Sequence, residues 1–256
     1  MNEKINLSTQ DIYRIINNCL DDKVPLAIIR YDDGESMMFN GVIEDTHFIL
    51  KKVLGYIPSE GEIALMKENL IKAYKECDVI GIPTERHLAR EDRWKDSLAV
   101  FKNAVSENTL MNKFKTSVDI FYDLLKDNLY APLFTGINTL NYISCRNLDD
   151  VFKEKFGIEN VNSFIISPEP TYTSGWTGDK HFPEQFLQIE QWIKTVPCEG
   201  NLCLVGAGIP GKIYNNWFRD QGGVSLDLGS IFDAWAGAKT RGKGRGLDVY
   251  DNINKL

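Results

Sequence analysis

The chain has 256 residues, of which 43% are hydrophobic and 25% charged, a composition typical of a globular protein with a substantial core. Its net charge of −7 argues against broad nucleic-acid binding through a basic face. Five scattered cysteines without a Cys-x-x-Cys pair, and three histidines without helical spacing, predict neither a disulfide framework nor a zinc site. We expect a cytoplasmic protein without a signal peptide or transmembrane segment, which leaves room for peripheral membrane contact.

Strands and helices are predicted to alternate along the chain. Short apolar runs bounded by glycine, proline or polar residues predict six buried strands, at 26–29, 79–82, 140–146, 161–166, 202–205 and 224–228. Apolar stripes at helical spacing, several of them preceded by capping residues, predict helices at about 8–20, 59–74, 93–105, 117–127, 151–156, 183–196 and 213–221. Residues 36–57 and 106–116 have weaker patterns, with a short helix expected at 37–39. The alternation predicts one Rossmann-like, doubly wound α/β domain over 1–256 with a mostly parallel sheet.

The first predicted strand runs directly into a charged sequence, Arg30-Tyr31-Asp32-Asp33-Gly34-Glu35. In open α/β sheets, ligands bind beyond the carboxyl ends of the strands. Carboxylates at such a place can hold a hard divalent cation, which in turn binds phosphates. The alternative is a polar turn between two elements, and these residues alone do not decide between the two interpretations.

A glycine-rich run, Gly206-x-Gly208-x-x-Gly211-Lys212, lies between the fifth predicted strand and a helix. Glycines there let the backbone approach a pyrophosphate, and a helix N-terminus offers N–H groups and partial positive charge, to which Lys212 would add. Asp227 ends the next strand, about where an acid binds ribose in dinucleotide folds. However, the run comes too late in the chain for a standard dehydrogenase, and Pro210 interrupts it. The alternative is a tight turn that needs glycine for close packing.

Further candidates follow other strands. Glu169, between two prolines, is a candidate general base or a loop acid that faces water. Arg30 and Arg146, both at strand ends, are candidate anion ligands or partners of nearby acids. A basic tail could clamp a diphosphate or remain a solvated segment, and it contains Lys239, Arg241, Lys243 and Arg245.

Aromatic residues and one histidine complete the candidates. Tyr172, Trp176 and Trp235 are residue types that stack on a sugar or a base, and each could equally belong to the core. His181 could bind substrate, but we favour the interpretation that it merely precedes the helix that begins near Pro183.

Both ends of the chain resemble the GT-D-type glycosyltransferases, bacterial enzymes of surface-glycan and glycoprotein assembly. Residues 30–35 look like the Arg-Phe-Gly-Asp-Gly-Glu signature of that family, with Tyr31 in place of phenylalanine and Asp32 in place of glycine. Residues 205–212 and 222–237 are similar to the C-terminal block of the family, and this block is the more specific of the two matches.

The resemblance implies a Rossmann-like fold, a nucleotide-sugar donor such as a UDP-sugar, and a divalent metal, commonly Mn²⁺ with Mg²⁺ as an alternative. Carried over by position, Asp33 and Glu35 would hold the metal and act in catalysis together with Glu169. The donor would be bound by residues near both ends of the chain: Arg30, Gly206, Gly208, Gly211, Lys212, Asp227 and Arg241. The acceptor would be a glycan, a lipid-linked glycan or a glycoprotein. Two alternatives stay open: a nucleotide-dependent oxidoreductase based on residues 206–227, and a non-catalytic module that binds a nucleotide sugar or glycan.

Overall fold

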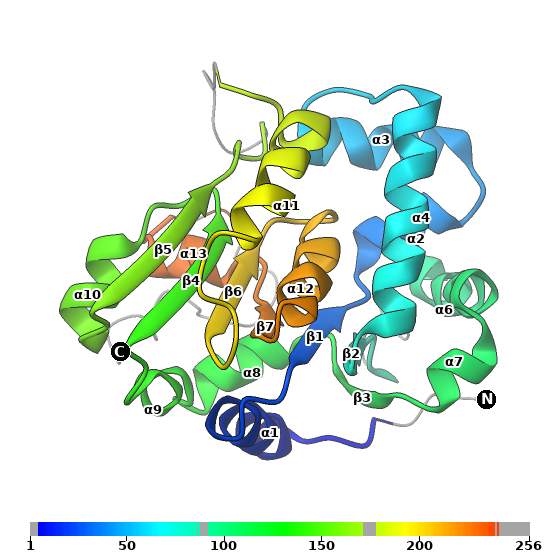
Figure 1. Cartoon of the computed structure of the whole chain (residues 1–256). Helices are drawn as coiled ribbons and strands as arrows, with labels where there is room; N and C mark the ends of the chain where they lie inside the picture. The colour runs from blue at the N-terminus through cyan, green and yellow to red at the C-terminus, as the bar shows by residue number, and fades with distance from the viewer. Residues whose placement is uncertain (1–4, 86, 88–91, 171–177, 239, 241–256) are drawn as a thin grey trace.

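A seven-stranded parallel sheet forms the centre of the protein (Figure 1). The computed structural model describes residues 5–85, 87, 92–170, 178–238 and 240. The strand order is β3-β2-β1-β7-β6-β4-β5, and all six neighbouring pairs are parallel. The strands are β1 (Leu26–Arg30), β2 (Val79–Ile82), β3 (Phe114–Ser117), β4 (Thr139–Ser144), β5 (Asn160–Ile165), β6 (Leu202–Gly206) and β7 (Val224–Asp227). The predicted doubly wound, parallel α/β fold is thus confirmed.

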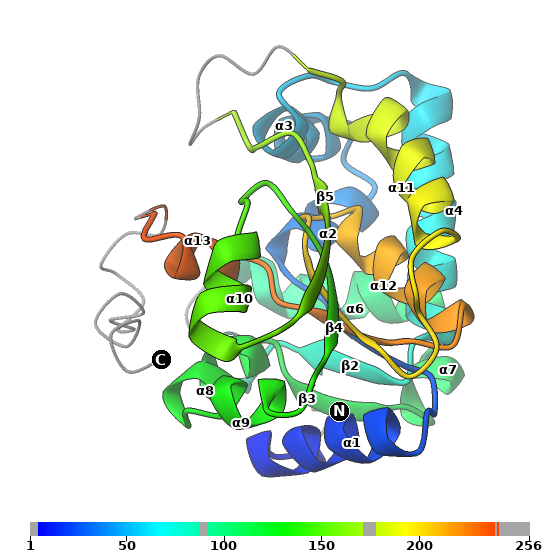
Figure 2. The same ribbon diagram turned by 60° about the vertical axis from the view of Figure 1, so that its left-hand side comes forward.

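Helices cover both faces of the sheet, which explains why its central strands are continuous apolar runs (Figure 2). The helices that share one core are α2 (Asp33–Phe39), α3 (Ile43–Leu54), α4 (Glu60–Glu76), α6 (Asp92–Val105), α7 (Glu107–Met111), α11 (Phe186–Ile193) and α12 (Gly211–Asp220). The helices of the opposite core are α1 (Thr9–Asp21), α8 (Ile120–Lys126), α9 (Tyr130–Phe134), α10 (Asp149–Phe156) and α13 (Ile231–Trp235). A π-helical turn, η1 (His181–Gln185), precedes α11.

Capping residues start the helices where the sequence predicts them. Ser8 caps α1 and Ser59 caps α4, each in a reciprocal capping box with the acid three residues later. The same device starts α2: the side chain of Asp32 accepts a hydrogen bond from the N–H of Asp33, and Glu35 accepts one from the N–H of Asp32. The acidic segment after β1 is therefore the first turn of a helix as well as the end of a strand.

Some elements differ from the prediction. β3 was not predicted because it is a short edge strand whose two buried residues, Lys115 and Thr116, are polar. α3 was not predicted because Ile43 and Phe48 are largely exposed, which breaks the apolar stripe that signals a helix. The predicted strand at 140–146 ends at Ser144, and the helix predicted at 117–127 begins at Ile120.

The connections after β4 and β6 run to opposite faces of the sheet. α10, which follows β4, packs in one core, whereas α12, which follows β6, packs in the other (Figure 2). Because β4 and β6 are neighbours, their loops separate and leave a crevice at their carboxyl ends. The topology thus predicts a ligand site between the loops that follow β4 and β6.

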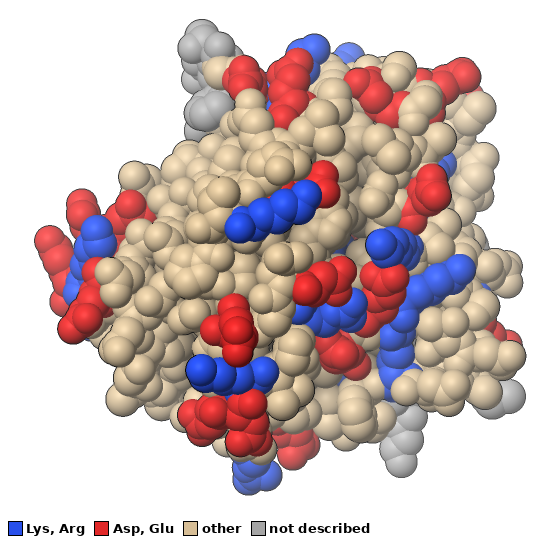
Figure 3. All heavy atoms as spheres, viewed as in Figure 1, with Lys and Arg blue, Asp and Glu red and all other residues tan. Residues whose placement is uncertain are grey.

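The surface of the protein carries both signs of charge. On the face seen in Figure 3, described basic side chains lie beside acidic ones and form no broad basic patch. Among the described residues, no helix is both long and apolar enough to cross a bilayer.

Candidate functional site

A cluster of buried charges lies where β1 and β7 end. The guanidinium of Arg30 donates two hydrogen bonds to the carboxylate of Asp227, from Nε at 3.1 Å and Nη2 at 3.0 Å, and Nε also contacts the Asp227 carbonyl. Asp32 lies 3.8 Å away on the other side of the same guanidinium. Register explains the meeting, because β1 and β7 are adjacent parallel strands and both side chains leave from their carboxyl ends.

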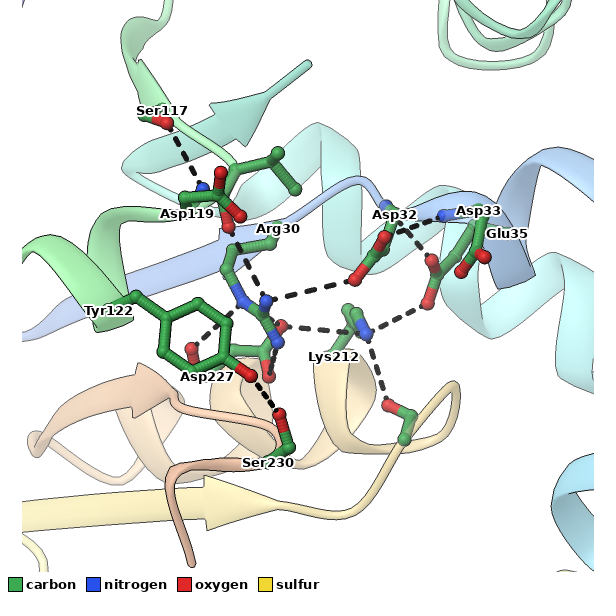
Figure 4. Close-up of polar contacts among 12 residues, drawn as sticks. Arg30, Asp32, Asp33, Glu35, Ser117, Asp119, Tyr122, Lys212, Asp227 and Ser230 are labelled. Carbon is green, nitrogen blue, oxygen red and sulfur yellow. Dashed lines mark hydrogen bonds and ion pairs between the residues drawn. The ribbon is translucent and has the colours of Figure 1, made fainter. Parts of the chain in front are cut away.

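Lys212, in the first turn of α12, connects this pair to the acidic segment. Its Nζ lies 2.9 Å from Oε1 of Glu35 and 3.5 Å from Oδ2 of Asp227 (Figure 4). It also donates to the carbonyl of Gly208 at 3.1 Å. We call Arg30, Glu35, Lys212 and Asp227 the buried charge cluster, and each of its members is at most 4% exposed.

The electrostatics of the buried charge cluster keep both cations charged. Burial by itself lowers the pKa of a lysine or arginine, but two carboxylates act against it. Asp227 and Glu35 raise the pKa of Lys212, and Asp227 with Asp32 raises the pKa of Arg30. Phe121 adds a cation–π contact, with its ring centroid 3.9 Å from the guanidinium carbon of Arg30. The cluster is therefore a closed set of paired charges.

A pocket that opens to solvent lies next to this cluster, at the crevice that the topology predicts. Most of its lining comes from the ends of four neighbouring strands and the loops after them: residues 144–146 at β4, 166–169 after β5, 206–208 at β6, and 229, 230, 232 and 233 after β7. Val53 and His181 complete the lining. Gly208 and Gly229, which line the pocket, also contact the buried charge cluster. The carbonyl of Gly208 accepts from Lys212, and Gly229 lies so close to Arg30 that a Cβ would approach Nη2 to 2.6 Å. The cluster therefore lies directly behind two residues of the pocket lining.

The three glycines of the 206–211 run have different structural reasons. A Cβ on Gly206 would lie 2.4 Å from the ring of Phe232, and one on Gly211 would lie 3.2 Å from Val205. Gly208 has a φ of +58°, which favours glycine. Moreover, the N–H groups of Gly211, Lys212 and Ile213 donate to carbonyls of the turn before them. Close packing therefore explains two of these glycines, and the wall of the pocket is formed by Gly206, Ala207 and Gly208.

Polar side chains reach the pocket from three other loops. Glu169 lines it from the loop after β5, as a candidate base must. Arg146 and Asp233 lie side by side in its lining, with Nε of Arg146 donating to Oδ1 of Asp233 at 2.8 Å. Ser230, also in the wall, is held by a 2.6 Å hydrogen bond with the hydroxyl of Tyr122 (Figure 4).

Of two further candidates, His181 lines the pocket, whereas Trp235 does not. His181 is buried, makes a 3.0 Å hydrogen bond with Tyr214, and has its pKa lowered by burial to about 4, so it is neutral at neutral pH. Trp235 packs in the core against Tyr130, Phe134 and Phe152 rather than in the pocket. Tyr172, Trp176, Arg241 and the other tail cations lie outside the described residues.

The arrangement of carboxylates is not that of a ready-made metal site. Both oxygens of Glu35 are engaged, one by Lys212 and the other by the N–H of Asp32. Asp33 is partly exposed and adjacent, but a metal held by both acids requires Glu35 to leave Lys212. Among the described residues, no group of three or more His, Cys, Asp or Glu side chains is placed to hold a metal ion. The residues present do not fit a metal in this arrangement, and its assignment to Asp33 and Glu35 stays a prediction.

The structure thus sorts the predicted site residues into two groups. Arg30, Glu35, Lys212 and Asp227 meet in the buried charge cluster, whereas Arg146, Glu169, His181, Gly206 and Gly208 line the pocket. Asp33 and Gly211 belong to neither group. Sequence reasoning did not select Ser144, Ser230 and Asp233, which also line it. Ser230 and Asp233 lie in the segment 222–237 that resembles the C-terminal block of the family, whereas Ser144 lies inside a predicted strand and carries no such signal.

Comparisons with known proteins identify the fold. No family model and no curated protein matches the sequence. Among solved structures, the chain is similar to the highly conserved domain of unknown function 1792, described as having a distinct glycosyltransferase fold: TM-score 0.55, 15% identity, 96% of this chain and 88% of that chain covered. It is also similar to a structure described as a new glycosyltransferase of this domain type from Streptococcus sanguinis: TM-score 0.57, 14% identity, 97% and 91% covered. The chain therefore has this glycosyltransferase fold over nearly its whole length.

Proposed function

We propose that this protein is a glycosyltransferase that moves a sugar from a nucleotide-diphosphate sugar, such as a UDP-sugar, to a hydroxyl group of a glycan, lipid-linked glycan or glycoprotein in surface-glycan synthesis. The observation that carries the proposal is the pocket between the loops after β4 and β6. It combines close backbone approach at Gly206–Gly208, a carboxylate at Glu169 and a cation at Arg146. The likeness to glycosyltransferase folds supports the same reaction class.

The reaction needs three things from these residues. The wall at 206–208 holds the diphosphate, because two glycines and one alanine leave the backbone open to phosphate oxygens. The acceptor oxygen attacks the anomeric carbon while the bond from that carbon to the diphosphate oxygen breaks. If the configuration inverts in one step, the acceptor proton passes to the carboxylate of Glu169, and the nucleoside diphosphate leaves with the bonding electron pair.

The buried charge cluster acts by positioning in this proposal. The charges of Lys212 and Arg30 are neutralised by Glu35 and Asp227. These two side chains therefore contribute through the backbone that they contact, which is the carbonyl of Gly208 for Lys212 and the segment at Gly229 for Arg30. The same burial counts against the oxidoreductase alternative. An acid that binds ribose must be accessible, and both oxygens of Asp227 are taken by Arg30.

Metal dependence is a separate part of the proposal, carried by the resemblance of residues 30–35 to an Asp-x-Glu signature. A divalent cation such as Mn²⁺ would neutralise charge on the departing diphosphate. Its binding at Asp33 and Glu35 would compete with Lys212 for Glu35. We expect Asp33→Ala to abolish any stimulation by Mn²⁺, and undiminished stimulation in this variant would remove the assignment.

A thermal-shift screen tests the proposal as a whole. Nucleotide sugars, their nucleoside diphosphates and NAD(H) are each added with and without Mn²⁺, and positive donors are then incubated for hydrolysis or transfer. We expect stabilisation by at least one nucleotide sugar and release of its nucleoside diphosphate. Stabilisation by NAD(H) alone would favour the oxidoreductase, and donor binding without turnover on any acceptor would favour the non-catalytic module.

A further inference from the structure

Arg146 is the only lysine or arginine among the described residues that line the pocket. It follows the end of β4, where the N–H of Arg146 donates to Oγ of Ser144 at 3.1 Å and fixes the turn. Its guanidinium donates through Nε to Asp233, and the two side chains are 20% and 17% exposed. Asp233 is itself held by the hydroxyl of Thr240 at 2.6 Å. The guanidinium is thus fixed at one edge and open at the other.

The two terminal nitrogens of Arg146 have no hydrogen-bond partner among the described residues. This distinguishes Arg146 from Arg30, whose Nη1 donates to the carbonyl of Val118 and whose Nη2 donates to Asp227. A planar guanidinium held by its Nε presents its terminal N–H groups as a preorganised fork, and this fork matches two phosphate oxygens. The backbone of Gly206–Gly208 lines the same pocket, and its glycines let a phosphate approach closely.

We propose that Arg146, oriented by Asp233, binds the diphosphate of the sugar-nucleotide donor directly. The inference rests on the proposed function and adds the residue that recognises the charged part of the donor. Lys212 and Arg30 cannot take this role without leaving buried carboxylates, whereas Arg146 can take it with its present ion pair intact. Asp233 is a positioning residue, because it acts on the donor through Arg146.

The test measures binding of UDP, GDP, ADP and CDP, each beside its own nucleoside, and of pyrophosphate as a competitor. The variants are Arg146→Ala, Arg146→Lys and Asp233→Asn. Arg219→Ala is the matched control, because Arg219 is 16% exposed and paired with Asp220 outside the pocket. For the diphosphate that the native protein binds best, we expect Arg146→Ala to weaken affinity about tenfold to a hundredfold, since charged hydrogen bonds are lost.

The remaining measurements identify the phosphate as the target. The affinity for pyrophosphate should fall by a similar factor in Arg146→Ala, and the affinity for the nucleoside should not change. Arg146→Lys should fall between the native protein and Arg146→Ala, because it keeps the charge but loses the fork. Asp233→Asn should raise the donor KM with a smaller effect on kcat, and Arg219→Ala should bind normally.

Two failures can be told apart. If the native protein binds a nucleoside diphosphate and Arg146→Ala binds it and pyrophosphate equally well, the assignment of Arg146 is wrong while the proposed function stands. An equal loss of nucleoside affinity would also overturn the assignment to phosphate. If the native protein binds no nucleoside diphosphate and no nucleotide sugar, the proposed function fails, and this inference fails with it.

Discussion

Replacing Asp227 by asparagine should strongly destabilise the protein, although the two side chains have nearly the same shape. The carboxylate makes contacts of 3.0 and 3.1 Å with Arg30 and one of 3.5 Å with Lys212, and it is 4% exposed. Asp227→Asn keeps the shape but removes the charge, so two buried cations are left with too few carboxylates. Removing one partner of a buried ion pair costs about 3–5 kcal/mol. For a chain of this length that corresponds to a fall in Tm of roughly 6–20 °C.

Asp220→Asn is the matched control for this prediction. Asp220 approaches Arg219 even more closely, at 2.6 Å, but its side chain is 41% exposed. An exposed ion pair contributes only about 0–1 kcal/mol, because water solvates both charges after the pair breaks. Urea unfolding followed by tryptophan fluorescence gives both free energies. If the two variants lose similar free energy, burial does not set the strength of the Asp227 contacts, and our account of the cluster is refuted.

Two further predictions concern the pocket and its surroundings. Burial lowers the pKa of His181 from 6.5 to about 4. Between these pH values, the unfolded chain takes up a proton that the folded protein excludes. The free energy of unfolding is therefore highest above pH 6.5 and falls toward pH 4. Urea unfolding should show a loss of about 2 kcal/mol from pH 7.5 to pH 5 that is smaller in His181→Gln; equal losses in both proteins would contradict it. Gly206→Ala should cost about 1–3 kcal/mol, because its Cβ would lie 2.4 Å from the ring of Phe232. Gly61→Ala, in an open position of α4, should by contrast be neutral or stabilising in the same assay.

Much of the fold could be predicted because its signals are local. The apolar runs of the central strands and the capping boxes at Ser8 and Ser59 depend on residues close in sequence. Five elements were not predicted: three helices of five residues each (α7, α9 and α13), β3 and α3. For β3 and α3, the burial of the side chains is decided by distant partners. Lys115 and Thr116 are buried by packing that no strand pattern announces, and Phe48 remains exposed although it is apolar.

The sequence by itself determined that charged and glycine-rich segments follow the ends of buried strands, and it thereby predicted a site at that edge of the sheet. Only the tertiary structure decided which charges are neutralised in buried ion pairs and which can bind a ligand. Strand order places Asp227 beside Arg30, and α12 brings Lys212 to Glu35, so these four charges neutralise one another in a buried environment. Because α10 and α12 pack on opposite faces of the sheet, the pocket opens between the loops that lead to them, beside Arg146. Pairing of charges depends on distances between segments far apart in the chain, and no local pattern contains that information.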